Sequence, residues 1–203
     1  MDRKKHWEEI HTTKELEDVS WYQVTPETSL QLIDTGNLDK TASIIDIGGG
    51  DSFLVDHLLE FGFTNITVLD ISQQAIDKAK KRLGERQTEV TWIVTDITSF
   101  TPKQNYDIWH DRAAFHFLTA QDDIEKYTSI LSQSIQENGT AIIGTFSKDG
   151  PTKCSGIDIK QYSQKEFEGL FGKDFSTKDF INVDHLTPTK NRQNFNFITL
   201  EKN

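Results

Sequence analysis

The sequence predicts an α/β protein with a doubly wound, mostly parallel seven-stranded sheet that ends in an antiparallel hairpin. Short β-branched runs alternate with helical patterns from residue 43 to residue 147. This alternation is typical of parallel strands joined by crossover helices. The last two strand-like runs are separated only by TPTK, which is too short for a crossover and therefore favours antiparallel pairing.

The first five strands each end near glycine or an acidic or polar residue, and helical patterns lie between most of them. Ser72 and Gly84 are suited to begin and end one of these helices as N-cap and C-cap. The expected strands are SIIDI (43–47), NITVLDI (65–71), VTWIVTDI (90–97), YDIWH (106–110) and TAIIGTFS (140–147). The expected helices are SFLVDHLLEFG (52–62), SQQAIDKAKKRLG (72–84) and DDIEKYTSILSQSIQENG (122–139).

The two ends of the chain follow different patterns. A helix is expected at 163–172, and the hairpin strands at 175–186 and 191–202. Near the start, PETSLQLIDTG (26–36) predicts a helix with Pro26 in its first turn. We interpret residues 1–40 as a cap over the carboxyl ends of the strands; a surface-packed helix pair is the alternative. The expected organisation is a single domain, 1–203, with a cap (1–40), a ligand-binding core (41–147) and a substrate loop with the C-terminal hairpin (148–203).

Composition and charge restrict the class of protein. The chain has 203 residues, 35% hydrophobic and 27% charged, with a net charge of −10 and a pI near 5.0. These values suit one soluble domain, and the acidic balance disfavours a nucleic-acid partner. Cys154 is the sole cysteine, so no internal disulfide forms. No signal-peptide pattern and no apolar run of ~20 residues are present, so we expect a cytoplasmic protein without a membrane partner, by default a monomer.

The stretch IIDIGGGDSFLVD (44–56) places three glycines at the end of the first strand, where ligands bind in a doubly wound sheet. A triphosphate-binding loop would need Gly-Lys-Ser/Thr, and no lysine lies near Gly50. A dinucleotide turn would need a third glycine at the position of Phe53, whose ring blocks the approach of a pyrophosphate. The remaining pattern is Asp-x-Gly-x-Gly, formed by Asp46, Gly48 and Gly50.

Two further acids follow this pattern at the ends of the next strands. Asp70 ends the second strand and Asp96 ends the third. Either acid alone could be an ordinary helix N-cap or a solvated turn residue. Three acids at the carboxyl ends of successive strands, one of them beside the glycine turn, favour a shared binding site over that interpretation.

At these residues the sequence resembles the class I S-adenosylmethionine-dependent methyltransferases, over roughly residues 40–147, with a further glycine often found where this chain has Ser52. The resemblance implies the Rossmann-like methyltransferase fold, with S-adenosylmethionine as cofactor and S-adenosylhomocysteine as product. It implies that the turn packs against the methionine and ribose, that Asp46 helps to position the cofactor's ammonium and that Asp70 accepts the ribose hydroxyls. It further implies cofactor contacts at Gly48, Gly50, Asp51, Ile71, Asp96 (adenine amine) and Ile97 (adenine ring).

A second informative stretch is WHDRAAFHFLT (109–119), which the resemblance places beneath the transferable methyl group. His110 and Asp111 are expected to contact the cofactor. Arg112 is expected to pair bidentately with a substrate carboxylate, and His116 to act as general base. The alternative is a structural Asp111–Arg112 ion pair with His116 packed on the helix behind the strand. The histidines show no metal-ligand spacing, so no metal is expected.

The resemblance extends to small single-domain bacterial methyltransferases and, more loosely, to citrate-synthase and elongation-factor lysine methyltransferases. It implies that Trp21 and Tyr22 close over the sulfonium, because aromatic faces attract such cations. The segment 150–163 either defines the substrate or is a flexible connection, and Cys154 is either a site thiol or an inert buried one.

Three functions remain open from the sequence. The leading hypothesis is a methyltransferase acting on a small molecule or a protein side chain. The first alternative is a non-catalytic adenosylmethionine-binding or interaction module. The second is a dehydrogenase-like NAD enzyme, against which Phe53 argues.

Overall fold

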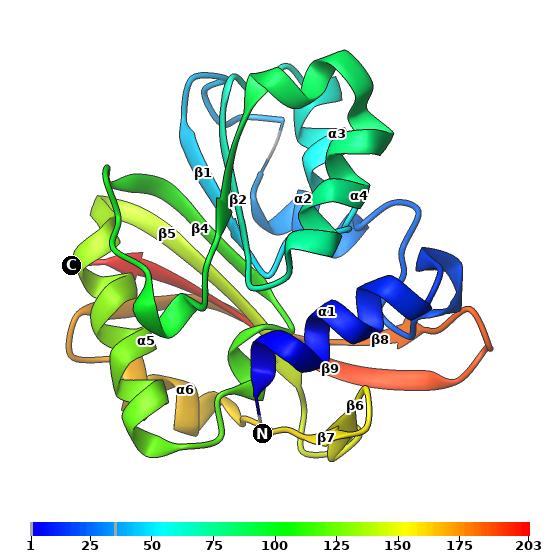
Figure 1. The fold of residues 1–203 in the computed structure, drawn as a ribbon. Coiled ribbons are helices and arrows are strands. Elements are labelled where there is room, and N and C mark those ends of the chain that lie inside the picture. The colour runs from blue at the N-terminus through cyan, green and yellow to red at the C-terminus, as the bar shows by residue number, and fades with distance from the viewer. Residues whose placement is uncertain (1, 35) are drawn as a thin grey trace.

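A computed structural model describes residues 2–34 and 36–203 and confirms the predicted sheet (Figure 1). Within these residues, seven strands form one sheet in the order β3-β2-β1-β4-β5-β9-β8. The first five are parallel, and β9 runs antiparallel to both β5 and β8. The strands are β1 (Ser43–Ile47), β2 (Asn65–Asp70), β3 (Val90–Val94), β4 (Tyr106–Arg112), β5 (Ile135–Phe146), β8 (Phe175–Leu186) and β9 (Arg192–Lys202).

Helices cover both faces of the sheet because its central strands are apolar on both sides. Ile44 and Ile45 are adjacent in β1 and fully buried, yet they belong to two separate hydrophobic clusters, one on each face. In Figure 1, one face carries α2 (Glu27–Leu32), α3 (Leu54–Glu60) and α4 (Gln73–Leu83), and the other carries α5 (Gln121–Ser134) and α6 (Gln164–Phe171).

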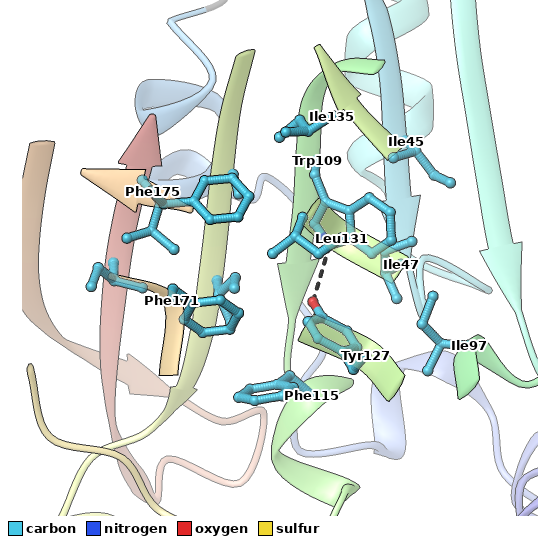
Figure 2. Close-up of a cluster of buried hydrophobic side chains, with 14 of the residues drawn as sticks. Ile45, Ile47, Ile97, Trp109, Phe115, Tyr127, Leu131, Ile135, Phe171 and Phe175 are labelled. Carbon is cyan, nitrogen blue, oxygen red and sulfur yellow. Dashed lines mark hydrogen bonds between the residues drawn. The ribbon is translucent and has the colours of Figure 1, made fainter. Parts of the chain in front are cut away.

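The cluster beneath α5 orients β4. Trp109 is fully buried, and its indole Nε1 donates a hydrogen bond to Tyr127 Oη over 3.0 Å (Figure 2). Phe115 packs against the same tyrosine, with ring centroids 4.5 Å apart. Because strand side chains alternate between faces, turning Trp109 toward α5 turns His110 and Arg112 toward the opposite face.

Several predicted boundaries are confirmed, but the third strand ends at Val94 and not at residue 97, and the helix before β5 ends early. Ser72 caps the N-terminus of α4 by accepting from Ala75 N, and Gly84 is its C-cap. The helix expected to run to residue 139 instead ends at Ser134, and β5 begins at Ile135. Ile135 continues the apolar helical spacing, so periodicity alone cannot place the boundary. The pairing of Ile135 with Tyr106 in β4 commits it to the sheet.

The N-terminal helix α1 (Arg3–Thr13) lies across the carboxyl ends of the strands. Its Glu8 carboxylate accepts hydrogen bonds from the Ser72 hydroxyl and from the backbone N–H groups of Gln73 and Gln74, at 2.9–3.1 Å. Three unpaired donors at the start of α4 are thereby satisfied. A short hairpin, β6 (Lys153–Cys154) and β7 (Ile157–Asp158), forms within the segment between β5 and α6. None of the described helices is both long and apolar enough to span a bilayer.

Candidate functional site

A cavity lies at the carboxyl ends of the first four strands, beneath α1 and the segment that follows it. Asp46, Asp70, Asp96 and His110 all line this cavity. The parallel order β3-β2-β1-β4 brings these residues to one edge, although they are distant in the sequence. The remaining predicted cofactor contacts that line it are Trp21, Tyr22, Gly48, Asp51, Ile71 and Ile97.

Glycine is required in the turn after β1 by both conformation and space. Gly48 has a φ of 67°, and a Cβ there would lie 2.7 Å from Ala114 Cβ. A Cβ on Gly50 would lie 2.5 Å from Asp70 Oδ2. The backbone therefore passes directly over the Asp70 carboxylate, and any larger residue would displace either the turn or that acid.

Asp46 belongs to a buried polar chain under the turn. Its Oδ1 lies 2.7 Å from His110 Nδ1, and His110 Nε2 lies 2.8 Å from Ser29 Oγ on α2. Asp46 Oδ2 is buried and has no hydrogen-bond partner among the described residues. One carboxylate oxygen is thus held in place, while the other is left for a ligand. Ser29 was not anticipated, because its contact with His110 spans α2 and β4.

Asp70 presents its carboxylate to the cavity from the end of β2. Oδ1 accepts a hydrogen bond from Ser72 N at 2.8 Å. Burial raises the pKa of Asp70 to about 7, with the nearby Asp46 charge adding to this effect and the Ser72 hydrogen bond opposing it. Hydroxyl groups of a ligand would supply the donors that stabilise its ionised form.

Asp96 is already engaged by the chain itself. Its Oδ1 accepts from Thr98 N and Oγ1, so the residue is also the N-cap of a short turn. Its Oδ2 accepts from Arg3 of α1 at 2.9 and 3.2 Å. Burial raises the pKa of Asp96, but the Thr98 hydrogen bonds and the Arg3 charge outweigh this effect and lower it. No local pattern in the sequence indicated that Arg3 would contact Asp96.

Asp51 lines the cavity but serves to anchor the glycine turn. Its carboxylate is buried and forms an ion pair with Arg82 of α4. Arg82 also pairs with Asp56 at 2.9 Å and donates to Ser52 O at 2.8 Å. One guanidinium therefore joins the turn, α3 and α4, which sequence spacing could not reveal.

Aromatic rings from the N-terminal segment of the chain cover one side of the cavity. Trp7 lies 5.8 Å from Trp21 and 4.9 Å from Phe117 between ring centroids, both edge-to-face. Tyr22 packs edge-on against Phe53 at 6.2 Å. Trp21 and Tyr22 thus line the cavity, and Trp7 joins them from α1.

Arg112 also lines the cavity, but Asp111 does not pair with it. Arg112 Nη1 donates to Trp21 O at 3.0 Å, and the guanidinium lies 5.1 Å from the centre of the Phe195 ring. Burial lowers the pKa of Arg112 to about 10, so it stays charged at neutral pH. Its position supports the predicted role of binding an anion and does not support the structural ion-pair alternative.

Asp111 faces away from the cavity, contrary to its predicted cofactor contact. It is fully buried; Oδ1 accepts from Ala114 N and Phe115 N, and Oδ2 accepts from Tyr127 Oη at 2.7 Å. Burial raises its pKa to about 6. Asp111 therefore holds the turn after β4 against α5, because strand alternation places it on the Trp109 side.

The geometry does not support His116 as general base. Its side chain is fully buried and is not part of the cavity lining. Burial, together with the Arg112 charge, lowers the pKa of His116 to about 3. Its Nε2 has no partner in the described part of the chain, and Nδ1 lies 3.4 Å from Phe146 N. This placement agrees with the alternative of a packed core histidine.

Cys154 lines the cavity from the β6–β7 hairpin. It is buried, and burial raises the pKa of its thiol. The thiol is therefore protonated at neutral pH, which favours the inert alternative. Within residues 2–34 and 36–203, no cluster of histidine, cysteine or acidic residues could hold a metal ion.

Known proteins are similar to this chain in sequence and in fold. A family model described as a methyltransferase domain matches residues 44–139. The malonyl-[acyl-carrier protein] O-methyltransferase 2 of Ilyobacter polytropus is 27% identical over 112 residues, which are 55% of this chain and 42% of that protein. The EEF1A lysine methyltransferase 2 of Danio rerio is 24% identical over 158 residues, covering 70% of this chain and 68% of the relative. Across three malonyl-[acyl-carrier protein] O-methyltransferases, the match spans only 39–56% of their length.

Among solved structures, N-methyltransferase NodS from Bradyrhizobium japonicum WM9, in complex with S-adenosylhomocysteine, superposes with a TM-score of 0.75. The match is 15% identical and covers 99% of each chain, so it establishes the fold. The strand order, the acids around the glycine turn and the domain match together define a nucleoside-cofactor-binding α/β domain. Residues 44–139 match a methyltransferase domain, and the fold is that of S-adenosylmethionine-dependent methyltransferases, whose cofactor is S-adenosylmethionine.

Proposed function

We propose that the chain transfers the methyl group of S-adenosylmethionine to a small molecule or a protein side chain. The observation that carries this proposal is the Asp70 carboxylate, held behind Gly50 at the edge of the cavity with Asp46 and Asp96 on neighbouring strands.

The residues present fit the cofactor. The backbone at Gly50 leaves the Asp70 carboxylate close to the turn, where two ribose hydroxyls can donate to it. The unpartnered Asp46 Oδ2 suits an ammonium, and the cavity-lining Ile71 and Ile97 offer apolar surfaces to a flat ring. The proposed contact of Asp96 with the adenine amine requires its Oδ2 to be shared with, or released by, Arg3.

When bound, the cofactor supplies a methyl group on an electrophilic sulfonium, and a lone pair of the acceptor displaces the thioether. The chain's part is to align the acceptor and exclude water. Trp7, Trp21 and Tyr22 are placed to exclude water from the N-terminal side. With His116 outside the cavity lining, an acceptor that arrives ionised or unprotonated is favoured.

A non-catalytic adenosylmethionine-binding module is the alternative. Such a module would lack room for an acceptor beside the end of β4. The cavity instead continues past His110 to Arg112, Phe146 and Phe195, which supports an enzyme.

Calorimetric titration with S-adenosylhomocysteine tests the proposal. The wild type should bind, and Asp70→Ala should weaken binding by about 10-fold or more, through loss of two charge-assisted hydrogen bonds. Asp77→Ala is the matched control, because Asp77 is an exposed α4 acid outside the cavity lining. A wild type that does not bind the product would refute the proposal. Transfer of labelled methyl to lysate proteins and, separately, to lysate metabolites would distinguish the two acceptor types.

A further inference from the structure

Arg112 carries a charge that the described part of the chain does not neutralise. Its Nη1 is used by Trp21 O, whereas its Nη2 is buried without a hydrogen-bond partner. Within residues 2–34 and 36–203, no carboxylate forms an ion pair with it. By contrast, Arg3 and Arg82, the other partly buried arginines at the site, each pair with two acids. Burial of a guanidinium without a paired anion has an unfavourable free energy. An anion from a bound ligand would therefore stabilise Arg112 in this position.

The guanidinium extends toward the strands beyond β4. Asp46, Asp70 and Asp96 stand on β1, on β2 and after β3, on one side of β4. The Arg112 guanidinium lies over Phe195, which belongs to β9, two strands beyond β4 on the other side. Two strand spacings are roughly 10 Å. Arg112 therefore reaches the β9 side of the cavity, while its hydrogen bond to Trp21 O keeps it beside a proposed cofactor contact.

The surroundings of Arg112 are apolar and aromatic. Phe195 packs edge-on against Phe146 at 4.7 Å, and both rings line the cavity together with Trp21. These rings can hold the flat or apolar body of a small molecule while the guanidinium binds a charged end. A lysine ammonium would meet a like charge at this position, which disfavours a protein lysine as acceptor.

We propose that Arg112 binds a carboxylate of the methyl acceptor and that the substrates are small organic acids with an apolar or aromatic body. The inference rests on the proposed function and narrows its acceptor. The planar fork of arginine matches the two oxygens of a carboxylate, which a point charge such as lysine does not.

The histidines of the cavity are poorly suited to act as general bases, which agrees with an acceptor that is already ionised. His11 and His110 are the histidines found in its lining. His110 is engaged at both nitrogens by Asp46 and Ser29. Burial and the Lys78 charge lower the pKa of His11 to about 4, which leaves it a weak base. A carboxylate needs no base to become nucleophilic, so a carboxylate can itself be the methylated group.

The test uses the full chain saturated with S-adenosylhomocysteine, with benzoate as the probe and benzamide as its uncharged counterpart. Millimolar benzoate should raise the melting temperature of the wild type by roughly 2–4 °C, and benzamide should not. Arg112→Gln should abolish the benzoate shift while changing the S-adenosylhomocysteine Kd less than about threefold. Arg86→Gln is the control, because Arg86 is a half-exposed arginine that pairs with Glu89 and lies outside the cavity lining.

Removal of an unpaired buried charge should leave Arg112→Gln at least as stable as the wild type. If this variant does not fold, the guanidinium is structural and the inference fails. Arg112→Lys gives a second measurement, since it keeps the charge but loses the fork and should reduce the benzoate shift.

Other outcomes separate this inference from the proposed function. A wild type that binds S-adenosylhomocysteine but ignores benzoate, or responds equally to benzamide, overturns the inference alone. A further outcome is that Arg112→Gln loses S-adenosylhomocysteine binding but keeps binding of 5′-methylthioadenosine, which lacks the amino-acid end. The guanidinium would then hold the cofactor's own carboxylate, and the inference would again be overturned. A wild type without S-adenosylhomocysteine binding, but with an Arg112-dependent benzoate shift, would refute the proposed function and retain the carboxylate site.

Discussion

The guanidinium of Arg3 lies against the carboxylate of Asp96, with 2.9 Å between Nη2 and Oδ2. Arg3 Nη1 also reaches Asp123 at 2.7 Å, so one side chain ties α1 to the turn after β3 and to the start of α5. The same Asp96 is proposed to meet the adenine amine. On this proposal, the first helix and the cofactor would compete for one carboxylate oxygen.

Arg3→Ala should strengthen cofactor binding. Without the guanidinium, Asp96 Oδ2 is free for the adenine amine, and we expect the Kd for S-adenosylhomocysteine to fall about 3–10-fold. Calorimetry would measure this change, and stopped-flow fluorescence of the cavity tryptophans should show faster association. Arg86→Ala, which breaks an exposed pair with Glu89, should change neither value. A weaker Kd in Arg3→Ala would mean that α1 holds the cofactor and does not compete with it.

The Asp70 carboxyl should make the stability of the ligand-free chain depend on pH. Its folded pKa is raised to about 7, above the ordinary value of 3.8, so the folded chain binds more protons than the unfolded chain between these values. Stability is then lost as pH rises from about 4 through 7, by up to a few kcal/mol. Asp70→Asn should flatten this loss in urea denaturation measured from pH 5 to pH 8.

Cofactor binding should show the opposite trend, because ribose hydroxyls donate to the ionised carboxylate of Asp70. The wild-type affinity for S-adenosylhomocysteine should rise between pH 6 and pH 8, while Asp70→Asn should bind weakly at both. An affinity independent of pH in this range would argue against a direct contact with Asp70.

Gly48→Ala should disrupt the turn. Its φ of 67° disfavours a side chain, and the new Cβ would lie 2.7 Å from Ala114 Cβ. We expect a loss of about 2–3 kcal/mol in the free energy of unfolding, together with loss of product binding. Gly169→Ala in α6 is the matched control: nothing lies within 4 Å of its Cβ, so it should stabilise the helix by roughly 0.5–1 kcal/mol. Equal effects of the two substitutions would refute the role assigned to Gly48.

His110→Ala should destabilise the fold more than Ser29→Ala. The histidine satisfies both the Asp46 carboxylate and the Ser29 hydroxyl in a buried setting, so its loss leaves two unpartnered polar groups. We expect a cost of about 2–4 kcal/mol for His110→Ala and about 1 kcal/mol for Ser29→Ala, measured by urea denaturation. A larger loss from Ser29→Ala would show that Ser29 on α2, and not His110, holds this group of hydrogen-bonded side chains together.

Local patterns in the sequence predicted most of the fold. The hairpin strand at 175–186 and the first strand at 43–47 have the bounds that their strand-like and β-branched runs indicated. The boundary between α5 and β5 was misplaced, because Ile135 satisfies helical spacing and strand pairing equally well. Only the partner strand decides between the two.

The sequence by itself determined that acids and a glycine turn meet at the carboxyl ends of parallel strands, because strand ends and turn residues are local signals. The tertiary structure decided which side chains face the cavity. The packing of Trp109 against Tyr127 turns Asp111 into the core and leaves Arg112 in the cavity. The tertiary structure also determined the ion pairs Arg3–Asp96 and Asp51–Arg82. Contacts between distant segments depend on how the helices pack, and they leave no local pattern in the sequence.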